Sequence, residues 1–436
     1  MKKRLLSLAL AITSMVTILS ACSGGSSDES GKTTGEEIVL NYPTAQVGVN
    51  TSAPIVKQLI AEFNEEYAGK YKVVVEEVPG DANYIEKIKI LLANGELPPV
   101  IYGAGYNLLD LALEKDLLVD LTETMENDPE WKAMLDEQTI AINSRDGKLY
   151  GVPNEKSIVG YYYNEELFAK AGIEAPAETW DEFFAQCDKL LEAGITPLAL
   201  DTADSAWTTS LWLGAMAATE NEAGYDFIQT MNPFDYNTPE FINALENVQT
   251  MLQKYTTLDA VGGKYEHAAN NFLSGQAAMI ANGSWMMGDF GDETKAPAGF
   301  DEKVAVTKFP GGLIYNDPMQ GYLVTKNDDP AIVEASIAFV KHMTSAHAQT
   351  LALETQGIIP ASATVEVSDV AKGNFPLLAD IVIQTQEATV HSRYTQGTMF
   401  PNLLDVLSRE LPNLANDVIT AEELANILTV EAQKNK

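Results

Sequence analysis

Cysteine and histidine are scarce in this chain of 436 residues, which contains two cysteines and four histidines. Cys22 lies in the N-terminal leader described below, so Cys187 has no partner for an internal disulfide. Cys187 lies on an apolar helical stripe and is expected to be a core residue. His342 and His347 are five residues apart, a poor spacing for one helix face, and the sequence predicts no metal site.

Sequence signatures of enzymes are also missing. The chain has no Gly-x-Ser-x-Gly, no His-Glu-x-x-His, no Walker loop and no calcium-loop pattern. Gly103-Ala104-Gly105 follows a strand-like run but lacks the third glycine of a dinucleotide-binding loop. A carboxylate pair suited to glycoside hydrolysis stays open among 62 acidic residues, although no acid stands out. We expect no catalytic residue and no cofactor.

Positive charge is in short supply. There are 28 lysines and arginines against 62 acids, which gives a formal charge of −34, and loss of Lys2, Lys3 and Arg4 with the leader makes it −37. Such a chain has no electrostatic reason to bind nucleic acid or anionic lipid. Two interpretations of the acidity stay open, a solvated surface that aids solubility and the attraction of a cationic ligand.

The N-terminus has the features of a secreted leader. Three basic residues precede an apolar run from Leu5 to Leu19, which is too short for a stable transmembrane helix. The small residues before Cys22 resemble a bacterial lipobox, a signal that is removed before a cysteine whose thiol carries diacylglycerol. A plain signal peptide with an incidental cysteine is the alternative. We expect a signal peptide over 1–21, a Gly/Ser-rich tether over 22–37, and attachment to the outer face of a cell membrane, as in a Gram-positive bacterium.

About 400 residues follow the tether, which exceeds one typical core and predicts two lobes. Strand and helix patterns alternate with short connections, which favours a parallel or mixed sheet covered by helices. The expected strands are 38–42, 71–78 and 100–102, and the expected helices are 54–67 and 84–94, the second ending at Gly95.

Later helices carry clear start signals. Thr179 and Glu182 form a predicted capping box, and Thr420 and Glu423 form another. Thr238-Pro239 and Asp329-Pro330 each place a capping residue before a proline at the first helical position.

Several segments, in order along the chain, resemble the family 1 extracellular solute-binding proteins, which include maltose-binding protein and capture carbohydrates for ABC importers. The segments are 146–153 (DGKLYGVP), 162–168 (YYNEELF), 170–173 with Pro176, 179–183 (TWDEF), 272–279 (FLSGQAAM), 283–285 (GSW), and 338–341 through to 360–361.

The resemblance implies an α/β fold with two lobes, a hinge made of chain crossings and a ligand cleft between the lobes. By analogy, lobe 1 covers 38–152 and 308–358, and lobe 2 covers 158–304 and 362–436. Crossing strands can act as hinges while each lobe stays rigid.

Two tryptophans lead the candidate ligand-binding residues, because sugars stack their apolar faces on aromatic rings. Trp285 aligns with a ligand-stacking tryptophan of the family, and Trp207 falls where the family often places an aromatic residue of the second lobe. A packing role in the core is the alternative for both. Trp212 lies on an apolar helix and is expected in the core.

Other candidates follow expected strands or lie at the crossings. They are Thr44, Gln46 and Asn50 after the first strand, Tyr102 and Tyr106 after the third, Asn154 and Ser157 at the first crossing, Asp204 near Trp207, Gln320, and Met399 with Phe400. A simple loop or cap role is the alternative for Asp204. The pattern around Arg393 and Tyr394 does not decide whether they contact ligand.

Two departures from the family pattern keep the ligand open. Pro99 stands where the family often has an acid, and the loop after the first strand has no charged residue at its tip. We expect a monomeric, lipid-anchored protein that delivers a sugar or oligosaccharide to a membrane permease driven by a separate ATPase. The alternatives are a binding protein for another small ligand such as a polyamine, a surface carbohydrate enzyme, and an adhesin.

Overall fold

The computed structural model describes residues 37–436, except 49, 51, 104–107 and 363. The expected signal peptide, Cys22 and nearly all of the tether lie outside the described residues, as does Tyr106. No helix in the described part of the chain is long and apolar enough to cross a membrane.

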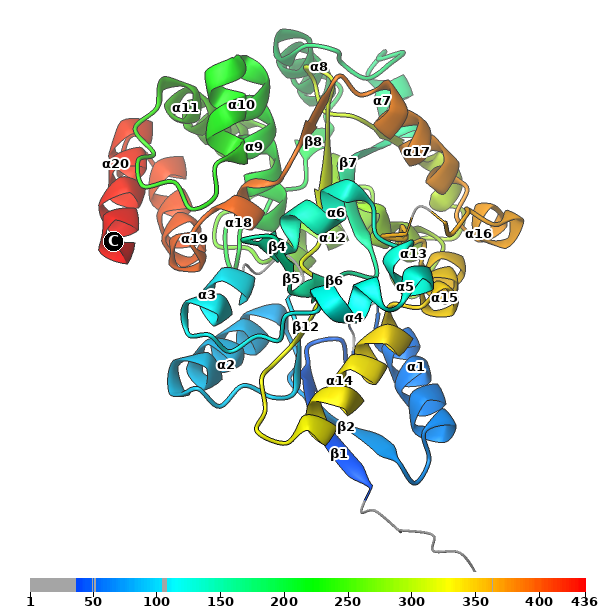
Figure 1. The fold of residues 1–436 in the computed structure, drawn as a ribbon. Helices are drawn as coiled ribbons and strands as arrows, with labels where there is room; N and C mark the ends of the chain where they lie inside the picture. The colour runs from blue at the N-terminus through cyan, green and yellow to red at the C-terminus, as the bar shows by residue number, and fades with distance from the viewer. Residues whose placement is uncertain (1–36, 49, 51, 104–107, 363) are drawn as a thin grey trace, which may run out of the picture. The chain divides into compact units, whose positions relative to one another are not determined.

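The first part of the chain supplies strands to three small sheets, one of which a later strand completes, with helices around them (Figure 1). Its elements are β1 Ile38–Thr44, α1 Ala53–Glu66, β2 Tyr71–Glu77, α2 Asp81–Asn94, β3 Val100–Tyr102, α3 Leu108–Glu114, α4 Thr122–Glu126, α5 Pro129–Lys132, α6 Glu137–Ile142, β4 Ser144–Arg145, β5 Lys148–Leu149 and β6 Gly151–Val152.

The middle of the chain supplies most of a larger sheet. Its elements are β7 Lys156–Asn164, α7 Glu165–Lys170, α8 Trp180–Glu192, β8 Thr196–Leu198, α9 Trp207–Glu220, α10 Glu222–Gln229, α11 Pro239–Lys254, α12 Tyr265–Leu273, β9 Ala277–Gly283, η1 Ser284–Met286, α13 Met287–Phe290, η2 Asp301–Lys303, β10 Val304–Thr307 and β11 Leu313–Pro318.

The last part returns to the first sheets and then to the larger one. Its elements are β12 Tyr322–Val324, α14 Pro330–Met343, α15 Ala346–Gln356, α16 Asp369–Asn374, α17 Leu377–Glu387, β13 Val390–Ser392, α18 Thr395–Thr398, α19 Pro401–Ala415, α20 Ala421–Ala432 and η3 Gln433–Asn435.

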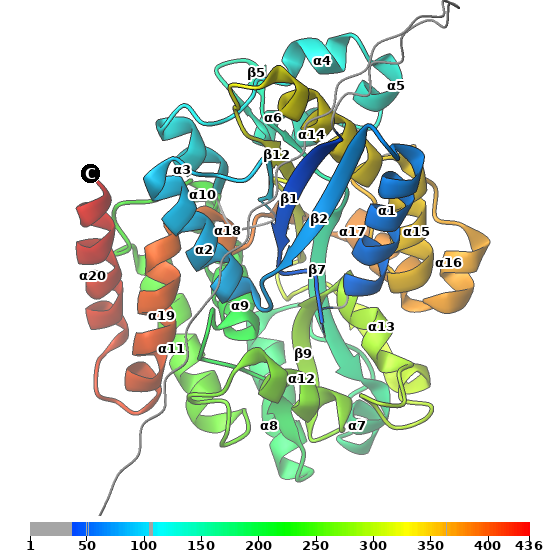
Figure 2. The ribbon, with the colours of Figure 1, turned by 90° about the horizontal axis from the view of Figure 1, so that it is seen from below.

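The sheets are mixed, as the alternation of patterns predicted. β1 pairs with β2 in parallel, and β12 lies antiparallel between β3 and β6, with Tyr322 opposite both Tyr102 and Val152. The larger sheet has the order β13-β11-β7-β9-β8, with β10 also paired to β7. α1 and α14 pack beside β1 and β2, and α11, α19 and α20 pack together on the larger unit (Figure 2).

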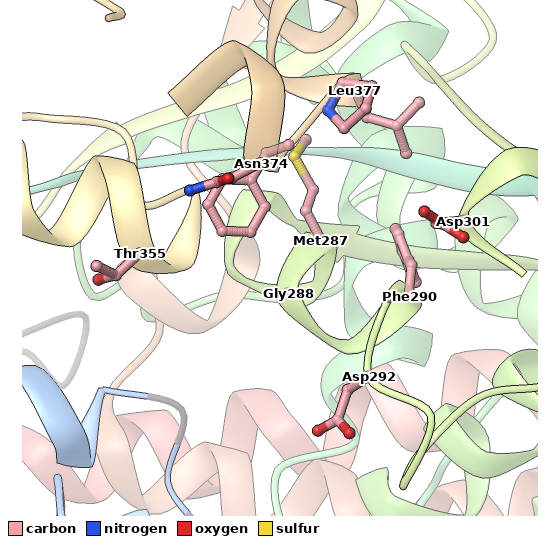
Figure 3. Close-up of a pocket in the computed structure, with 11 residues that line it drawn as sticks. Met287, Gly288, Phe290, Asp292, Asp301, Thr355, Asn374 and Leu377 are labelled. Carbon is pink, nitrogen blue, oxygen red and sulfur yellow. The ribbon is translucent and has the colours of Figure 1, made fainter. Parts of the chain in front are cut away.

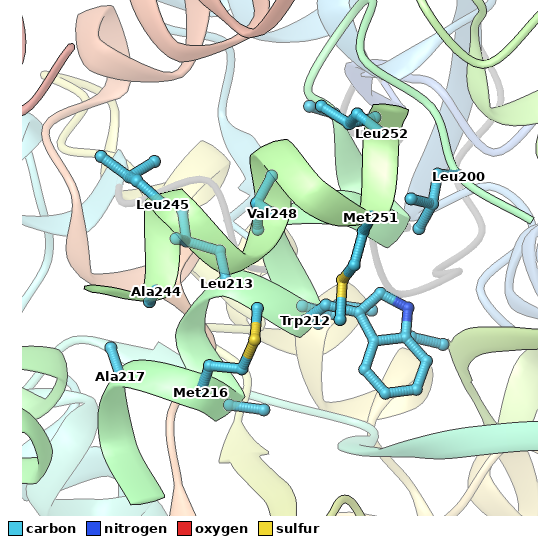
Figure 4. Packing of buried hydrophobic residues seen from close by; sticks show 14 of the residues in the cluster. Leu200, Trp212, Leu213, Met216, Ala217, Ala244, Leu245, Val248, Met251 and Leu252 are labelled. Carbon is cyan, nitrogen blue, oxygen red and sulfur yellow. The ribbon is translucent and has the colours of Figure 1, made fainter. Parts of the chain in front are cut away.

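Buried apolar side chains gather separately around the two groups of strands. One core, over the small sheets, includes Leu40, Phe63 and Phe339. A second core surrounds Trp212, whose ring centroid lies 4.9 Å from that of Phe183, and Cys187 is buried in it. Figure 4 shows Trp212 among aliphatic and methionine side chains of α9 and α11. The expectations that Trp212 and Cys187 are core residues are confirmed.

The expected elements are confirmed with small changes of boundary. The strand and helix ranges agree to within three residues, and Gly95 ends α2 in the left-handed conformation with φ 72°. Both capping boxes form, at Thr179 with Glu182 and at Thr420 with Glu423. Thr238 and Asp329 accept the expected hydrogen bonds at the starts of α11 and α14.

Three segments run between the two groups of strands. They are 153–155 between β6 and β7, 319–321 between β11 and β12, and 357–361 after α15. At the second of these, Gly321 has φ 65°, and a Cβ there would lie 2.3 Å from the Cα of Pro153. Only glycine allows the first two segments to approach this closely.

One predicted boundary differs from the observed pairing. The resemblance predicts that 308–358 belongs to lobe 1, whereas β11 pairs with β7 and β13 in the larger sheet. Its backbone hydrogen bonds therefore hold residues 313–318 with the larger unit, and the chain returns to the small sheet after Pro318.

Candidate functional site

An aromatic cluster forms where β8 and β9 end. These two strands are parallel, so their carboxyl ends meet at one edge of the sheet, and the segments that follow carry Trp207 and Trp285. The ring centroids of the two tryptophans are 6.0 Å apart, and Tyr394 contacts Trp207 edge-on at 5.4 Å. Both tryptophans are half-buried and Tyr394 is buried. This edge of the sheet is where α/β proteins commonly bind ligands.

Local contacts explain why these rings lie where they do. The indole N–H of Trp207 donates to the side-chain oxygen of Asn282 at 3.1 Å. The ring of Trp285 lies against Gly283, where a Cβ would be 2.3 Å from two of its carbons. The Gly283-Ser284-Trp285 motif therefore needs glycine, since any side chain at 283 would displace the indole.

A buried carboxylate fixes the start of α9 and thereby Trp207. Asp201 accepts hydrogen bonds from the backbone N–H groups of Trp207, at 3.0 Å, and Thr208, at 2.8 Å, and from the Thr208 hydroxyl. Burial is the main cause that raises the pKa of Asp201 from 3.8 to about 6, and these hydrogen bonds oppose it.

The raised pKa of Asp201 predicts a pH-dependent stability. Because the folded-state value of about 6 lies above the unfolded value of 3.8, the protonated form favours folding. The cost of the ionised group is present above pH 6 and disappears as the pH falls toward 4. When the pH is lowered from 7 to 4, the unfolding free energy of wild type should rise by up to about 3 kcal/mol relative to that of Asp201→Asn.

Urea denaturation of both proteins at several pH values measures this shift. Comparing wild type with the variant cancels the titration of the other carboxylates. A difference that stays constant with pH would contradict the role assigned to Asp201.

Tyr102 and Glu155 lie on the side of the small sheet. Tyr102 ends β3 and is buried, and its hydroxyl donates a hydrogen bond to the carboxylate of Glu155 on the first crossing segment. The ring of Tyr322 lies 4.9 Å from that of Tyr102. Burial raises the pKa of Glu155, and the hydrogen bond from Tyr102 opposes that effect.

A pocket of about 260 Å³ lies between the two groups of strands. The part of the chain around the small sheets contributes Asp110, Ala141, Ile142 and Arg145. The part around the larger sheet contributes Met231 and Arg393, and a crossing segment contributes Gln320. Both arginines are paired with carboxylates. Arg145 forms two hydrogen bonds with Asp110, at 2.7 and 2.9 Å, and Arg393 lies 3.1 Å from Asp317.

Three other predicted residues have buried polar side-chain atoms. Gln320 is buried and lines the pocket, where its side-chain oxygen accepts from the N–H of Leu109 at 3.2 Å. The side-chain oxygens of Gln46 and Asn154 are buried without a hydrogen-bond partner among the described residues. Buried polar atoms of this kind are sites where a ligand hydroxyl can donate.

Other predicted residues have local partners instead. Asp204 is exposed and lies 3.5 Å from the Lys264 ammonium. Phe400 packs against Phe234 at 5.0 Å, and Met399 is buried in the core. Thr44 and Asn50 accept hydrogen bonds from the backbone N–H groups two residues later, which are turn contacts. Ligand contact at all these positions stays a prediction.

A second pocket, of about 420 Å³, lies elsewhere and contains none of the predicted residues (Figure 3). Its walls come from α13, α15, α16 and α17, with Met287, Phe290, Thr355, Asn374 and Leu377 among the lining residues. No group of three histidine, cysteine, aspartate or glutamate side chains in the described ranges is arranged to hold a metal ion.

The comparisons with known proteins identify the family. A family model described as bacterial extracellular solute-binding protein matches residues 58–376. The chain belongs to this family. A probable sugar-binding periplasmic protein of Mesorhizobium japonicum is 25% identical over 324 residues, which cover 73% of this chain and 75% of that protein. The sn-glycerol-3-phosphate-binding periplasmic protein UgpB of Brucella abortus is 26% identical over 255 residues, which cover 54% of this chain and 55% of that protein.

Solved structures give the fold of this solute-binding protein. A chitin oligosaccharide binding protein superposes with a TM-score of 0.81 at 23% identity, covering 92% of this chain and 99% of that one. The predicted α/β fold with two lobes, as in maltose-binding proteins, is confirmed. The family consists of binding proteins, so the expectation that the chain is not an enzyme is also confirmed.

Proposed function

We propose that this solute-binding protein captures a sugar or oligosaccharide between its lobes and delivers it to the permease of an ABC importer. The observation that carries the proposal is the cluster of Trp207, Trp285 and Tyr394 at the strand ends. Indole and phenol rings match the apolar faces of sugar rings, and nearby amide and carboxylate oxygens match hydroxyl groups. The name of the Mesorhizobium relative supports a sugar ligand.

The site argues against two other ligands. A polyamine carries several charges and no sugar ring, and would need several unpaired acids, whereas Asp110, Asp317 and Asp204 are each paired with a cation. A phosphate ester, such as the ligand named for UgpB, would need cationic groups, but Arg145 and Arg393 are already paired with Asp110 and Asp317.

The proposed contacts are those predicted from the sequence, together with Tyr394. Trp207 and Trp285 stack on the sugar, while Tyr102, Gln46, Asn154 and Gln320 supply polar contacts; Tyr106, Asp204 and Phe400 are retained as outer candidates. We propose that lobe 1 comprises 38–152 and 322–358, and that lobe 2 comprises 156–318 and 362–436. The separate cores around the two groups of strands support this division.

Calorimetry with a panel of ligands tests the function. The panel contains chitin, xylan and maltose oligosaccharides, raffinose, glycerol phosphate and a polyamine. At least one saccharide should bind with a measurable dissociation constant and the last two should not. Binding of the polyamine alone, or of no saccharide, would overturn the proposal.

Closure of the lobes is a second expected result. The three crossing segments join the lobes. Gly321 has no side chain where it approaches Pro153, so the backbone can bend there as a hinge. Small-angle scattering should show a smaller radius of gyration when the binding sugar is added. The sugar contacts both lobes only in the closed state, so its binding increases the population of that state. Tight binding with an unchanged radius would contradict hinge closure.

We also propose that the mature protein is anchored through lipid on Cys22 at the extracytoplasmic face of the membrane, as a monomer working with a separate ATPase. The lipobox-like leader and the Gly/Ser-rich tether support this. Cys22→Ser should release the protein or leave its leader uncleaved, and should abolish labelling with a radioactive fatty acid. Retention and labelling that match wild type would contradict the anchor.

A further inference from the structure

Glu155 stands on the first crossing segment with its backbone held from both sides. It forms a β-bridge with Pro360 of the third crossing segment. On one side the N–H of Lys156 donates to the carbonyl of Ile359 at 2.9 Å, and on the other the N–H of Ala361 donates to the carbonyl of Asn154 at 3.3 Å. Glu155 therefore belongs to a crossing segment whose backbone is fixed by hydrogen bonds to the third crossing segment.

The carboxylate of Glu155 lies among tyrosines from both lobes. The Tyr102 hydroxyl donates to it from β3, and its charge adds to burial in raising the pKa values of Tyr322 and Tyr394. Tyr394 in turn contacts Trp207 of the aromatic cluster. The charge of Glu155 thus acts on Tyr394, one of the three rings of the aromatic cluster.

Glu155 has no cation beside it, whereas three other carboxylates near the two arginines and the aromatic cluster each have one. Asp110 pairs with Arg145, Asp317 with Arg393 and Asp204 with Lys264. The adjacent lysine, Lys156, pairs with Asp136 instead. Within the described ranges, no lysine or arginine nitrogen lies within 4 Å of the Glu155 carboxylate, which is only partly exposed to water.

The negative charge of the Glu155 carboxylate is therefore not fully balanced by its surroundings. It has lost part of its hydration, and the Tyr102 hydroxyl is neutral, so a positive charge placed beside it would gain more than at an exposed acid. The cations of the cleft cannot move to it without leaving Asp110 or Asp317 unpaired. Only three arginines follow the leader, and two of them are these paired ones, Arg145 and Arg393.

We propose that Glu155 receives an ammonium group of the ligand, so that the saccharide captured is an amino sugar or an oligosaccharide that contains one. This inference rests on the proposed function and narrows its substrate class. The ring of the sugar stacks on the aromatic cluster while its ammonium group completes the ion pair with Glu155. The strongly acidic chain also raises the local concentration of cationic ligands.

Two trisaccharides that differ only at nitrogen test the proposal. Chitosan trisaccharide carries free amines, and chitin trisaccharide carries the same rings with acetylated nitrogens. By calorimetry at a pH where the amine is protonated, wild type should bind chitosan trisaccharide about tenfold more tightly or better. Rising salt should weaken this preference while leaving the affinity for chitin trisaccharide nearly unchanged.

The variant Glu155→Gln keeps the shape and removes the charge. It should bring the two affinities to within about threefold, mainly by weakening chitosan trisaccharide binding. Asp188→Asn is the matched control, because Asp188 pairs with Lys254 on the surface and its loss changes the net charge equally. The control should keep the wild-type preference.

Each outcome has a clear consequence. Equal affinities in wild type, a preference for chitin trisaccharide, or a preference that survives in Glu155→Gln would overturn the role of Glu155. If Glu155→Gln does not fold, the wild-type comparison and its salt dependence still decide. If neither trisaccharide binds but another saccharide of the panel does, this inference fails and the proposed function stands.

Discussion

Trp285→Ala is expected to weaken saccharide binding by roughly 30-fold or more. Removing a central aromatic contact commonly costs on the order of 2–4 kcal/mol of binding free energy, and each 1.4 kcal/mol is about tenfold. The half-buried indole of Trp285 lies against Gly283 and beside Trp207, so its removal takes away one of two neighbouring stacking surfaces. Calorimetry with the saccharide that binds wild type measures the loss.

Stability separates a stacking role from a packing role. Alanine at a fully buried tryptophan costs about 3–5 kcal/mol of unfolding free energy, and the half-exposed Trp285 should cost less. Trp180→Ala is the matched control, since Trp180 is also half-buried but bonds to Thr219 on α9 at 2.8 Å, away from the cluster. That control should lose stability and keep its affinity.

A second variant moves the ring without deleting it. Gly283→Ala places a Cβ where the indole of Trp285 lies, so the ring must shift. We expect a loss of affinity in the same direction as for Trp285→Ala. Unchanged affinity in both variants, with a large drop in stability for Trp285→Ala, would make Trp285 a core residue and leave Trp207 and Tyr394 as the stacking surface.

The sequence predicted most of what depends on local chemistry. Capping residues such as Thr179 and the end of α2 at Gly95 act within a few residues, and their positions were correct. Trp207 and Trp285 were named through the resemblance to the family, and the structure places their rings 6.0 Å apart, while ligand contact stays a prediction.

Contacts between distant segments could not be predicted. Glu155 and Tyr102 are 53 residues apart, and their hydrogen bond depends on how the first crossing segment leaves the small sheet. The pattern around Tyr394 left its role open, although its ring meets Trp207. The pairing of β11 with β7 was also missed, because an apolar run shows that a strand forms and not which sheet it joins.

The pair of Asp317 and Arg393 predicts the largest loss of stability. Asp317 is 3% exposed and Arg393 is 17% exposed, with 3.1 Å between Oδ1 and Nε. Burial raises the pKa of Asp317, and the charge of Arg393 opposes that rise. Arg393→Met keeps much of the side-chain volume and leaves the carboxylate alone, which should cost about 3–5 kcal/mol at pH 7.

The pH dependence of this variant follows from the same contacts. Without Arg393 the pKa of Asp317 rises further, so the variant should recover stability relative to wild type as the pH falls and the carboxylate takes up a proton. The double variant Asp317→Asn with Arg393→Met should be more stable than Arg393→Met at pH 7, since no buried charge then stands alone.

An exposed pair supplies the control for the Arg393 experiment. Lys254 and Asp188 are half-exposed, and Lys254→Met should cost much less than Arg393→Met, with little pH dependence. Urea denaturation of the four proteins at pH 7 and pH 5 measures all of these values.

An Arg393→Met variant that loses no more stability than Lys254→Met would mean that water reaches Asp317 once Arg393 is gone. In that case Arg393 would be an exchangeable surface group, and a ligand anion could compete for it. A large loss would instead show Arg393 to be committed to Asp317, which is the condition under which Glu155 is left as the cleft carboxylate that needs a cation from the ligand.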